Sequence, residues 1–308
     1  MRLSDRVYAR LLSAAATRFV KAPSVSLTER SVGSPELVMV PTRHGPVRCY
    51  VTRPAPGAPL SSDGRVPPVH LNFHGGAFIV GAPHQDEHLV RGLAGEAGVV
   101  VVNVDYSAGT SVRYPQAHEE CFDVLQWVRS AGPERGWDPD RVTLSGTSAG
   151  ANLTLGVLEL ARRAGVPSVA AAALIVPPVD QTMPPEAYVA PPGSADKPFV
   201  NPRLARVLHN HYFADEQTRA DPLASPGLAD LEQLAALPPL LVFAAEKDSL
   251  RPAIERYVER LRAAGTDVEY RCMPGVDHGY TNQPGKDGVP ALRETSDLVA
   301  RFLVQHLA

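Results

Sequence analysis

Short runs of apolar, mostly β-branched residues alternate with stretches of helical periodicity along most of this chain. The strand-like runs are VHLNF (69–73), VVVVNVDY (99–106), RVTLSG (141–146), VAAAALIV (169–176), PPLLVFAAEKD (238–248) and DVEYRCMP (267–274). The helical stretches cover about 86–97, 116–129, the residues after Ser148, 252–264 and 292–307. Since continuous apolar strands that alternate with helices are typical of a parallel sheet covered on both faces, the pattern predicts an α/β fold with a mostly parallel central sheet flanked by helices.

The N-terminal part has a different pattern. ELVMVPT (36–42) and PVRCYVTRP (46–54) are joined by the turn residues RHGP, which predicts a β-hairpin. Before it, helical spacing puts Val7, Leu11, Leu12, Ala15 and Phe19 on one face of a helix with arginines between them. We expect this face to pack over the body of the protein, and a helix lying on a membrane surface is the alternative.

A proline-rich segment interrupts the alternation between about 180 and 227. Its first part, PPVDQTMPPEAYVAPPGSADKPFVNP, has too many prolines for a strand or a long helix, so we interpret it as an insertion. The predicted division is an N-terminal helical region (1–40) followed by one α/β domain (41–308) that carries the insertion.

Composition excludes several classes of function. With 308 residues, 44% hydrophobic and 20% charged, and a net charge of -3, the chain is an ordinary globular protein without a basic surface for nucleic acid. Arginines interrupt the N-terminal apolar residues and no apolar run reaches about 18 residues, so neither a signal peptide nor a membrane span is expected. The three cysteines, Cys49, Cys121 and Cys272, are interpreted as reduced core residues, and the predicted location is the cytoplasm.

The segment RVTLSGTSAGANL places Ser148 where a strand ends and a helix begins. The residues Gly146-Thr147-Ser148-Ala149-Gly150 match the G-x-S-x-G pattern of a nucleophile elbow, in which small neighbours let a serine project from a tight turn. An ordinary glycine-lined turn is the alternative interpretation. A serine hydroxyl needs a base to accept its proton and an acid to orient that base.

Candidates for the base and the acid follow the last two predicted strands. In proteins with this elbow, the serine is followed along the chain first by the acid, Asp or Glu, and then by the histidine base. That order makes Asp248 the acid and His278 the base. Both would lie at the same edge of the sheet as Ser148, because parallel strands end at one edge. Glu246, two positions before Asp248, is the alternative acid.

The segment NFHGGAF (72–78) is a glycine turn directly after a predicted central strand. Backbone N–H groups there could stabilise the negative oxygen that forms when a carbonyl is attacked, each donor contributing about 2.7–4 kcal/mol. Gly75 and Gly76 would supply two donors and Ala149, after the serine, a third. We expect His74 to anchor the turn by hydrogen bonds.

Other histidines give weaker signals. His84 and His88 are four positions apart, but the glutamate is not where a zinc protease needs it and no third ligand follows, so no metal is expected. His209 and His211 lie in the insertion and are interpreted as surface or cap residues.

From VHLNFHGG to its C-terminus the chain resembles the hormone-sensitive-lipase-like family of α/β-hydrolases, the bacterial carboxylesterases with a cap. The resemblance is carried by HGGAF, by VDY followed by YPQAHEECFDVLQWV, and by WDPDRVTLSGTSAGANL, DPLASP, DSLR and DHGY. It implies an α/β-hydrolase fold with a helical cap made from the N-terminal helix and part of the 180–227 insertion. It also implies a nucleophile at Ser148, an acid at Asp248, a base at His278 and oxyanion donors at Gly75, Gly76 and Ala149.

The chain departs from the family pattern at three places. Thr147 stands where many members have Asp, although a Gly-Thr-Ser-Ala-Gly branch is similar, and Ala77 replaces a third glycine. The segment SAGTSVRYP (107–115) replaces the usual Arg-Leu-Ala-Pro-Glu and is expected to reshape the wall of the pocket.

These observations predict a serine carboxylesterase that needs no cofactor or metal and acts on short-chain acyl esters of small molecules. The protein can form a homodimer in this interpretation. Two alternatives remain: a hydrolase of amides, lactones or formamides in a biosynthetic pathway, and a hydrolase-like protein that binds a ligand without chemistry.

Overall fold

The structure is a computed structural model that describes residues 3–19, 22–62, 64–192 and 197–308. Within these residues one eight-stranded sheet has the order β1-β2-β4-β3-β5-β6-β7-β8. Its strands are β1 (Glu36–Val40), β2 (Val47–Thr52), β3 (Pro68–Phe73), β4 (Val100–Asp105), β5 (Asp138–Thr147), β6 (Ala171–Ile175), β7 (Leu240–Ala245) and β8 (Val268–Met273). The first two form the predicted antiparallel hairpin, and from β4 to β8 the neighbours are parallel. The mostly parallel sheet predicted from the sequence is confirmed.

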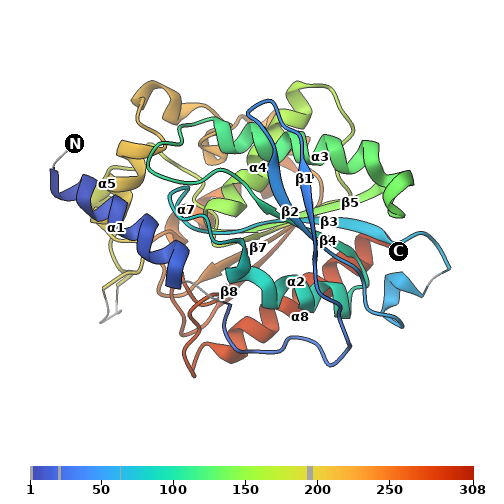
Figure 1. The fold of residues 1–308 in the computed structure, drawn as a ribbon. Coiled ribbons are helices and arrows are strands. Elements are labelled where there is room, and N and C mark those ends of the chain that lie inside the picture. The colour runs from blue at the N-terminus through green and yellow to red at the C-terminus, as the bar shows by residue number, and fades with distance from the viewer. Residues whose placement is uncertain (1–2, 20–21, 63, 193–196) are drawn as a thin grey trace.

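Helices cover both faces of this sheet (Figure 1). They are α1 (Leu3–Phe19), α2 (Glu87–Glu96), α3 (Gln116–Arg135), α4 (Ala149–Arg163), α5 (Pro202–His211), α6 (Leu231–Ala235), α7 (Arg251–Ala264) and α8 (Val289–Leu307). Short 3-10 helices are η1 (Pro59–Ser61), η2 (Pro83–Asp86), η3 (Pro185–Ala187), η4 (Glu216–Ala220) and η5 (Pro226–Leu228). None of the described helices is long and apolar enough to cross a lipid bilayer.

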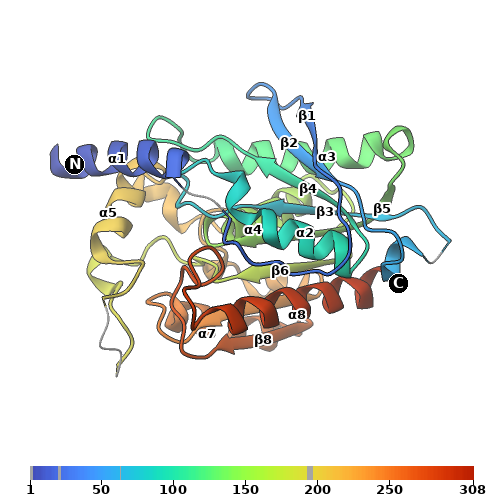
Figure 2. The same ribbon diagram turned by 60° about the horizontal axis from the view of Figure 1, so that its bottom comes forward.

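The core has two layers, one on each face of the sheet. Helices α3, α4 and α7 pack on one face, and their apolar side chains join one large buried cluster with the strands. Helices α2 and α8 pack on the other face in a second cluster (Figures 1 and 2). The inner strands β3, β4, β6 and β7 are buried on both sides, which explains why their sequences are mostly apolar.

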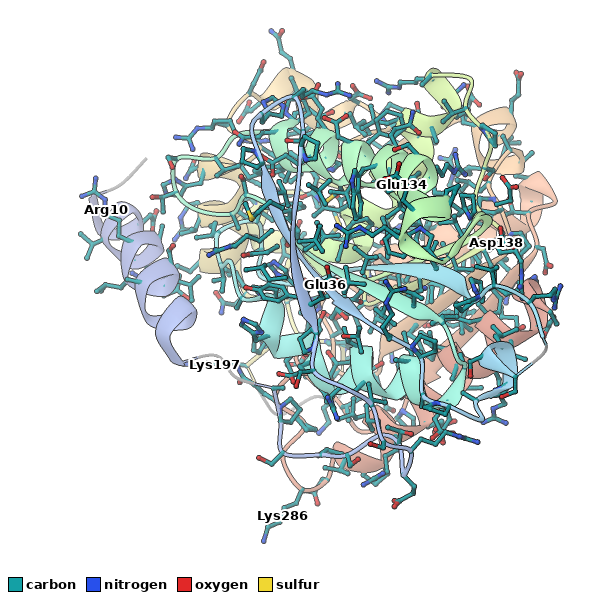
Figure 3. All side chains as sticks on the ribbon, turned by 45° about the vertical axis from the view of Figure 1, so that its right-hand side comes forward. Arg10, Glu36, Glu134, Asp138, Lys197 and Lys286 are labelled. Carbon is teal, nitrogen blue, oxygen red and sulfur yellow. The ribbon has the colours of Figure 1, made fainter. Side chains whose placement is uncertain are left out.

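The N-terminal helix α1 lies beside α5 in both ribbon views, outside the two core layers (Figures 1 and 2). Only part of the face predicted to pack inward does so: Leu12 is partly buried, but Val7 is 49% and Leu11 is 63% exposed, whereas Asp5 and Ala9 are buried. The side chains of Ala15 and Phe19 lie outside the described set. Arg10 extends away from the rest of the molecule on the outer side of this helix (Figure 3).

Buried Asp5 explains the rotation of α1 relative to the apolar pattern. Its Oδ2 accepts a hydrogen bond from Nε of Arg206 on α5 at 3.1 Å, and the guanidinium of Arg203 lies 4.2 Å from the centre of the Tyr8 ring. Helical periodicity counts apolar residues only, so it could not predict that a charged residue faces the protein.

The proline-rich segment contains one helix that the sequence analysis did not identify. Asn201 caps α5 by accepting hydrogen bonds from the N–H groups of Arg203 and Leu204, and Pro202 occupies the first helical position, where its missing N–H costs nothing. Residues 193–196 of the predicted insertion, and 1–2 and 20–21 of the predicted N-terminal region, lie outside the described residues.

One cysteine interpretation is also wrong. Cys49 and Cys121 are buried, but Cys272 is exposed because β8 is the last strand of the sheet and is only partly covered.

Candidate active site

Ser148 stands in a strained turn between β5 and α4, with φ 55° and ψ −118°. The turn brings the backbone on its two sides so close that only glycine fits. A Cβ at Gly146 would lie 2.2 Å from the carbonyl of Gly150, and one at Gly150 would lie 1.8 Å from the carbonyl oxygen of Phe73 at the end of β3. The two glycines therefore permit the turn that projects the Ser148 side chain beyond the edge of the sheet.

Three side chains from separate segments meet in one hydrogen-bonded line. His278 Nε2 lies 2.7 Å from Ser148 Oγ, and His278 Nδ1 lies 2.8 Å from Asp248 Oδ2. Since the carboxylate can only accept, Nδ1 carries the proton and leaves Nε2 as the acceptor of the serine hydroxyl. The structure thus brings Ser148, Asp248 and His278 together in the arrangement that activates a serine toward a carbonyl group.

Asp248 is held for this contact. It is fully buried, and its second oxygen, Oδ1, accepts the N–H of Leu250 at 2.9 Å. The alternative acid Glu246 does not contact His278; its Oε2 accepts the N–H of Gly275 at 2.6 Å near the surface. The geometry therefore favours Asp248 over Glu246 as the acid, a choice between two carboxylates that the sequence did not decide.

The glycine turn after β3 lies against Ser148. Gly75, Gly76 and Ala149 line the same cavity as the serine, and Gly76 has φ 134° with no room for a Cβ, which would lie 2.4 Å from the carbonyl oxygen of Val80. Ala77, in place of the family's third glycine, and Phe78 also adopt positive φ, 51° and 58°. The turn keeps its left-handed course without that glycine.

Two donors hold the carbonyl oxygen of Gly75. His74 Nδ1 lies 2.6 Å from it and Gln85 Nε2 donates to it at 2.8 Å. In a trans peptide the N–H of the next residue points opposite to this carbonyl, so both contacts fix the direction of the Gly76 N–H. Burial lowers the pKa of His74 to about 4, so the ring is neutral and serves as an anchor, as expected.

A cavity of about 300 Å³ opens over the serine. Its walls combine the site residues with side chains from α1 (Tyr8, Leu12) and α5 (Leu204, Ala205, Leu208), and with Tyr188, Phe199, Val200 and Leu250. No residue of 107–115 is among its described lining residues; instead Tyr114 packs on Tyr212 and Phe213 beyond the wall. The segment contacts the wall from behind, since the N–H of Gly109 donates to the carbonyl oxygen of the lining residue Phe78 at 3.0 Å, and the expectation that it reshapes the wall stays a prediction.

Two residues next to the acid and the base hold the segment that precedes α5. The carboxylate of Asp277 accepts the N–H of Phe199 at 2.8 Å and the N–H of His278 at 2.7 Å. Ser249 Oγ donates to the carbonyl of Val200 at 2.7 Å. The Phe199 ring lies over the His278 imidazole, with 5.9 Å between ring centres, so this segment covers the imidazole.

The remaining histidines do not form a metal site. Within the described residues no group of three His, Cys, Asp or Glu side chains could hold a metal ion. His88 Nε2 lies 2.9 Å from the carbonyl oxygen of Thr281, and His84 packs on Tyr50. His209 and His211 are buried, with 3% and 5% exposure, so they are not surface residues; both lie on α5, within the 180–227 insertion, and the interpretation as cap residues stays a prediction.

Sequence reasoning missed the polar residues of the cavity wall. Gln85, Thr281, Asn282 and Gln283 line the cavity. They belong to no recognised motif, and the only available signal was that Gln85 follows the glycine turn closely and the others follow His278.

Comparisons with known proteins agree with this geometry. Residues 70–282 match the family model described as alpha/beta hydrolase fold. The chain is 32% identical to carboxylesterase NlhH of Mycobacterium tuberculosis over 84% of its own length and 77% of that protein, and 33% identical to esterase LipI of the same species over 80% and 76%. Among solved structures, the esterase of Pyrobaculum calidifontis superposes with a TM-score of 0.81 at 29% identity, covering 99% of this chain and 94% of that one.

Proposed function

Because this chain belongs to the hormone-sensitive-lipase-like carboxylesterases of the α/β-hydrolase fold, we propose that it hydrolyses esters of small molecules through an acyl-enzyme at Ser148. Ester hydrolysis itself follows from the family, and the chain is an ester-hydrolysing enzyme. The roles of individual residues are the proposal. The observation that carries them is the line from Ser148 through His278 to Asp248.

In the first half of the reaction, Ser148 Oγ attacks the ester carbonyl while His278 Nε2 takes the serine proton. Asp248 stabilises the imidazolium that forms, and the N–H groups of Gly75, Gly76 and Ala149 stabilise the negative oxygen. When the tetrahedral intermediate collapses, His278 returns the proton to the leaving alcohol, and the acyl group stays on Ser148.

Water completes the cycle. His278 takes a proton from a water molecule as it attacks the acyl-enzyme, and then gives that proton to Ser148 as the carboxylic acid leaves. The chain's own side chains and backbone handle every proton and charge in this scheme.

We propose that the N-terminal helix of the region 1–40 and part of the 180–227 insertion act as a cap that bounds the pocket. The support is that Tyr8 and Leu12 of α1 and Leu204 and Leu208 of α5 line the cavity together. Each methylene that is buried contributes about 0.8 kcal/mol until the chain meets the wall, so we expect short acyl chains, acetyl to hexanoyl, to give the highest kcat/KM. Long-chain triglycerides should be poor substrates.

The test of the mechanism is Ser148→Ala together with active-site labelling. The variant should lose ester hydrolysis by about 10⁴-fold or more while its circular dichroism spectrum stays that of the wild type. A fluorophosphonate probe should label the wild type at Ser148 alone. Undiminished turnover in the variant, or labelling at another serine, would refute the assignment.

The two alternative functions use the same scaffold. A ligand-binding protein without chemistry would not turn over p-nitrophenyl acetate, and the serine, aspartate and histidine aligned at hydrogen-bonding distance favour catalysis. A hydrolase of amides, lactones or formamides would show a higher kcat/KM on those substrates than on the matched esters.

We propose three further properties. The protein works in the cytoplasm, and its three free cysteines support this location. It has no nucleic-acid partner, and it can form a homodimer, which sedimentation would test. The N-terminal region and the insertion belong to the same functional unit as the α/β domain.

A further inference from the structure

One side chain from another element reaches the glycine turn beside Ser148. Gln85 lies in η2, and its Nε2 donates to the carbonyl oxygen of Gly75 at 2.8 Å. The side chain is 6% exposed, so water does not compete for this bond. His74, whose Nδ1 lies 2.6 Å from the same oxygen, belongs to the turn itself. Gln85 therefore ties this carbonyl to a part of the chain outside the turn.

The carbonyl of Gly75 points away from the cavity. His74, which also reaches it, is fully buried and, among the described residues, is not one that lines the cavity. In a trans peptide the N–H of Gly76 points opposite to this carbonyl, toward the cavity. A Cβ at Gly75 would lie 3.6 Å from the Cβ of Ser148, so the peptide lies against the serine. The group that holds this carbonyl thus sets the direction of an N–H close to the reacting atoms.

The preceding peptide has an anchor of its own. Tyr106 Oη donates to the carbonyl oxygen of His74 at 2.7 Å, and the two rings stack with 4.3 Å between their centres. This contact fixes the peptide that carries the N–H of Gly75. Loss of the Gln85 amide should consequently change the direction of the Gly76 N–H while the Gly75 N–H keeps its own support.

Gln85 is held firmly in place by its neighbours on both sides. Asn103 Nδ2 donates to the carbonyl oxygen of Pro83 at 2.9 Å, and Asn72 Nδ2 donates to Asp86 Oδ2 at 3.3 Å. Both asparagines are buried and come from the central strands β4 and β3. The sheet therefore fixes η2 before and after Gln85. A donor that is fixed in advance needs no reorganisation when charge develops in the site.

Resting on the proposed acyl transfer at Ser148, we infer that Gln85 is a positioning residue of the oxyanion site. Its amide holds the Gly75–Gly76 peptide so that the N–H of Gly76 points at the carbonyl oxygen of the ester. Gln85 acts through this peptide, whereas the N–H itself contacts the oxygen. Because that oxygen becomes negative only as the serine attacks, misalignment of the donor should lower kcat and leave KM nearly unchanged.

The experiment compares Gln85→Met and Gln85→Asn with the wild type. Methionine has a similar length without a donor, and asparagine keeps the amide but is one methylene shorter, so its nitrogen does not reach the carbonyl of Gly75. We expect both variants to lower kcat for p-nitrophenyl acetate about tenfold, with KM within about twofold of the wild type. Circular dichroism and thermal unfolding check the fold. If Gln85→Met unfolds, Gln85→Asn, which keeps a polar side chain, supplies the test.

A second measurement separates positioning from a structural role. Trifluoroacetone accepts the serine oxygen at its carbonyl carbon, and the carbonyl oxygen becomes negative as His278 takes the serine proton. The adduct therefore needs the same N–H groups as the transition state. Its inhibition constant should rise about tenfold in both variants, in proportion to the loss of kcat/KM. Gln126→Met, the same replacement at an exposed position of α3, should leave kcat, KM and the inhibition constant unchanged.

Three results would overturn the inference: wild-type kcat in both variants, a raised KM with kcat unchanged, or a loss of kcat without weaker binding of trifluoroacetone. Wild-type activity in Gln85→Asn alone would also overturn it, because the amide would then act without reaching the Gly75 carbonyl. The proposed function is tested separately, by the dependence of wild-type hydrolysis on Ser148. That dependence can hold whether or not Gln85 positions the donor.

Discussion

At the scale of single residues, Asp248 and Glu246 lie two positions apart on one chain and have unrelated partners. Asp248 is fully buried against His278, while Glu246 accepts a backbone N–H near the surface. Strand geometry explains the difference, since both residues follow the end of β7 and only the later one reaches the site.

This difference predicts a ranking of two conservative variants. Asp248→Asn should lower kcat by about 10⁴-fold, because an amide neither stabilises the imidazolium nor holds the productive tautomer. Glu246→Gln should stay within about threefold of the wild type, since its contact is local and partly solvated. Steady-state hydrolysis of p-nitrophenyl acetate measures both, with thermal unfolding as a control for folding. The reverse ranking would move the role of the acid to Glu246.

The sequence was sufficient to identify the candidate catalytic residues that lie at the ends of strands. Ser148, Asp248 and His278 each follow a predicted strand, and parallel strands end at one edge, so their meeting could be expected. Gln85 could not be found in this way. Its role depends on the carbonyl oxygen of Gly75 that its amide reaches in the folded protein, and no local sequence pattern records that contact.

At the scale of elements, Asp277 and Ser249 join the segment before α5 to the neighbours of the acid and the base. Asp277→Ala removes two hydrogen bonds, to Phe199 and to His278. We expect kcat to fall about tenfold with a smaller change in KM, since the imidazole loses the contacts that position it. Ser249→Ala should give a smaller loss in the same direction.

The matched control is Asp297→Ala, which removes an exposed carboxylate on α8. It should leave both constants unchanged. The prediction fails if Asp277→Ala raises KM alone, because the segment would then affect substrate binding without affecting the position of the base.

The docking of α1 on α5 gives a second prediction at this scale. Asp5→Ala removes the buried acceptor of Arg206, so α1 should pack less tightly and the wall formed by Tyr8 and Leu12 should loosen. We expect the ratio of kcat/KM for hexanoyl to acetyl esters to change about threefold or more, with kcat for acetyl esters nearly constant. Val7→Ala, on the exposed side of the same helix, is the control. Equal changes for both chain lengths would argue against a wall formed by α1.

The hairpin, the parallel strands and the long helices could be predicted because burial dictates their apolar spacing. The orientation of α1 could not, since the buried carboxylate of Asp5 and its ion pair with Arg206 determine it, and two apolar residues are exposed as a result. Helix α5 was not predicted, because it lies in a proline-rich segment where its Asn-Pro start could not be distinguished from the other prolines.

At the scale of the whole molecule, buried histidines couple stability to pH. Burial lowers the pKa of His70 to about 3 and that of His74, His88, His118 and His209 to about 4. In the unfolded chain a histidine has a pKa near 6.5, so between about pH 6.5 and 4 the unfolded state binds more protons than the folded state. The free energy of unfolding should therefore fall by several kcal/mol as the pH drops through this window.

One buried carboxyl acts in the opposite direction. Burial raises the pKa of Asp86 to about 7, so its folded form keeps a proton that the unfolded chain has released, and stability is lost as pH rises from about 4 to 7. Five histidines outweigh this one group. Urea unfolding at about pH 7.5 and about pH 5 should show a net loss on acidification, and Asp86→Asn should make that loss steeper. Equal stability at both pH values in the wild type would contradict the prediction.

The distribution of the site over the sheet also has a kinetic consequence. Ser148 follows β5, the glycine turn follows β3, Asp248 follows β7 and His278 follows β8, so no local segment contains a working site. Parallel pairing of strands distant in sequence is slow, because the chain must close long loops before the contacts compensate. After dilution from denaturant, the recovery of enzyme activity should consequently lag behind the recovery of the helical circular dichroism signal. The rate at which activity returns would then report how fast β8 pairs with β7.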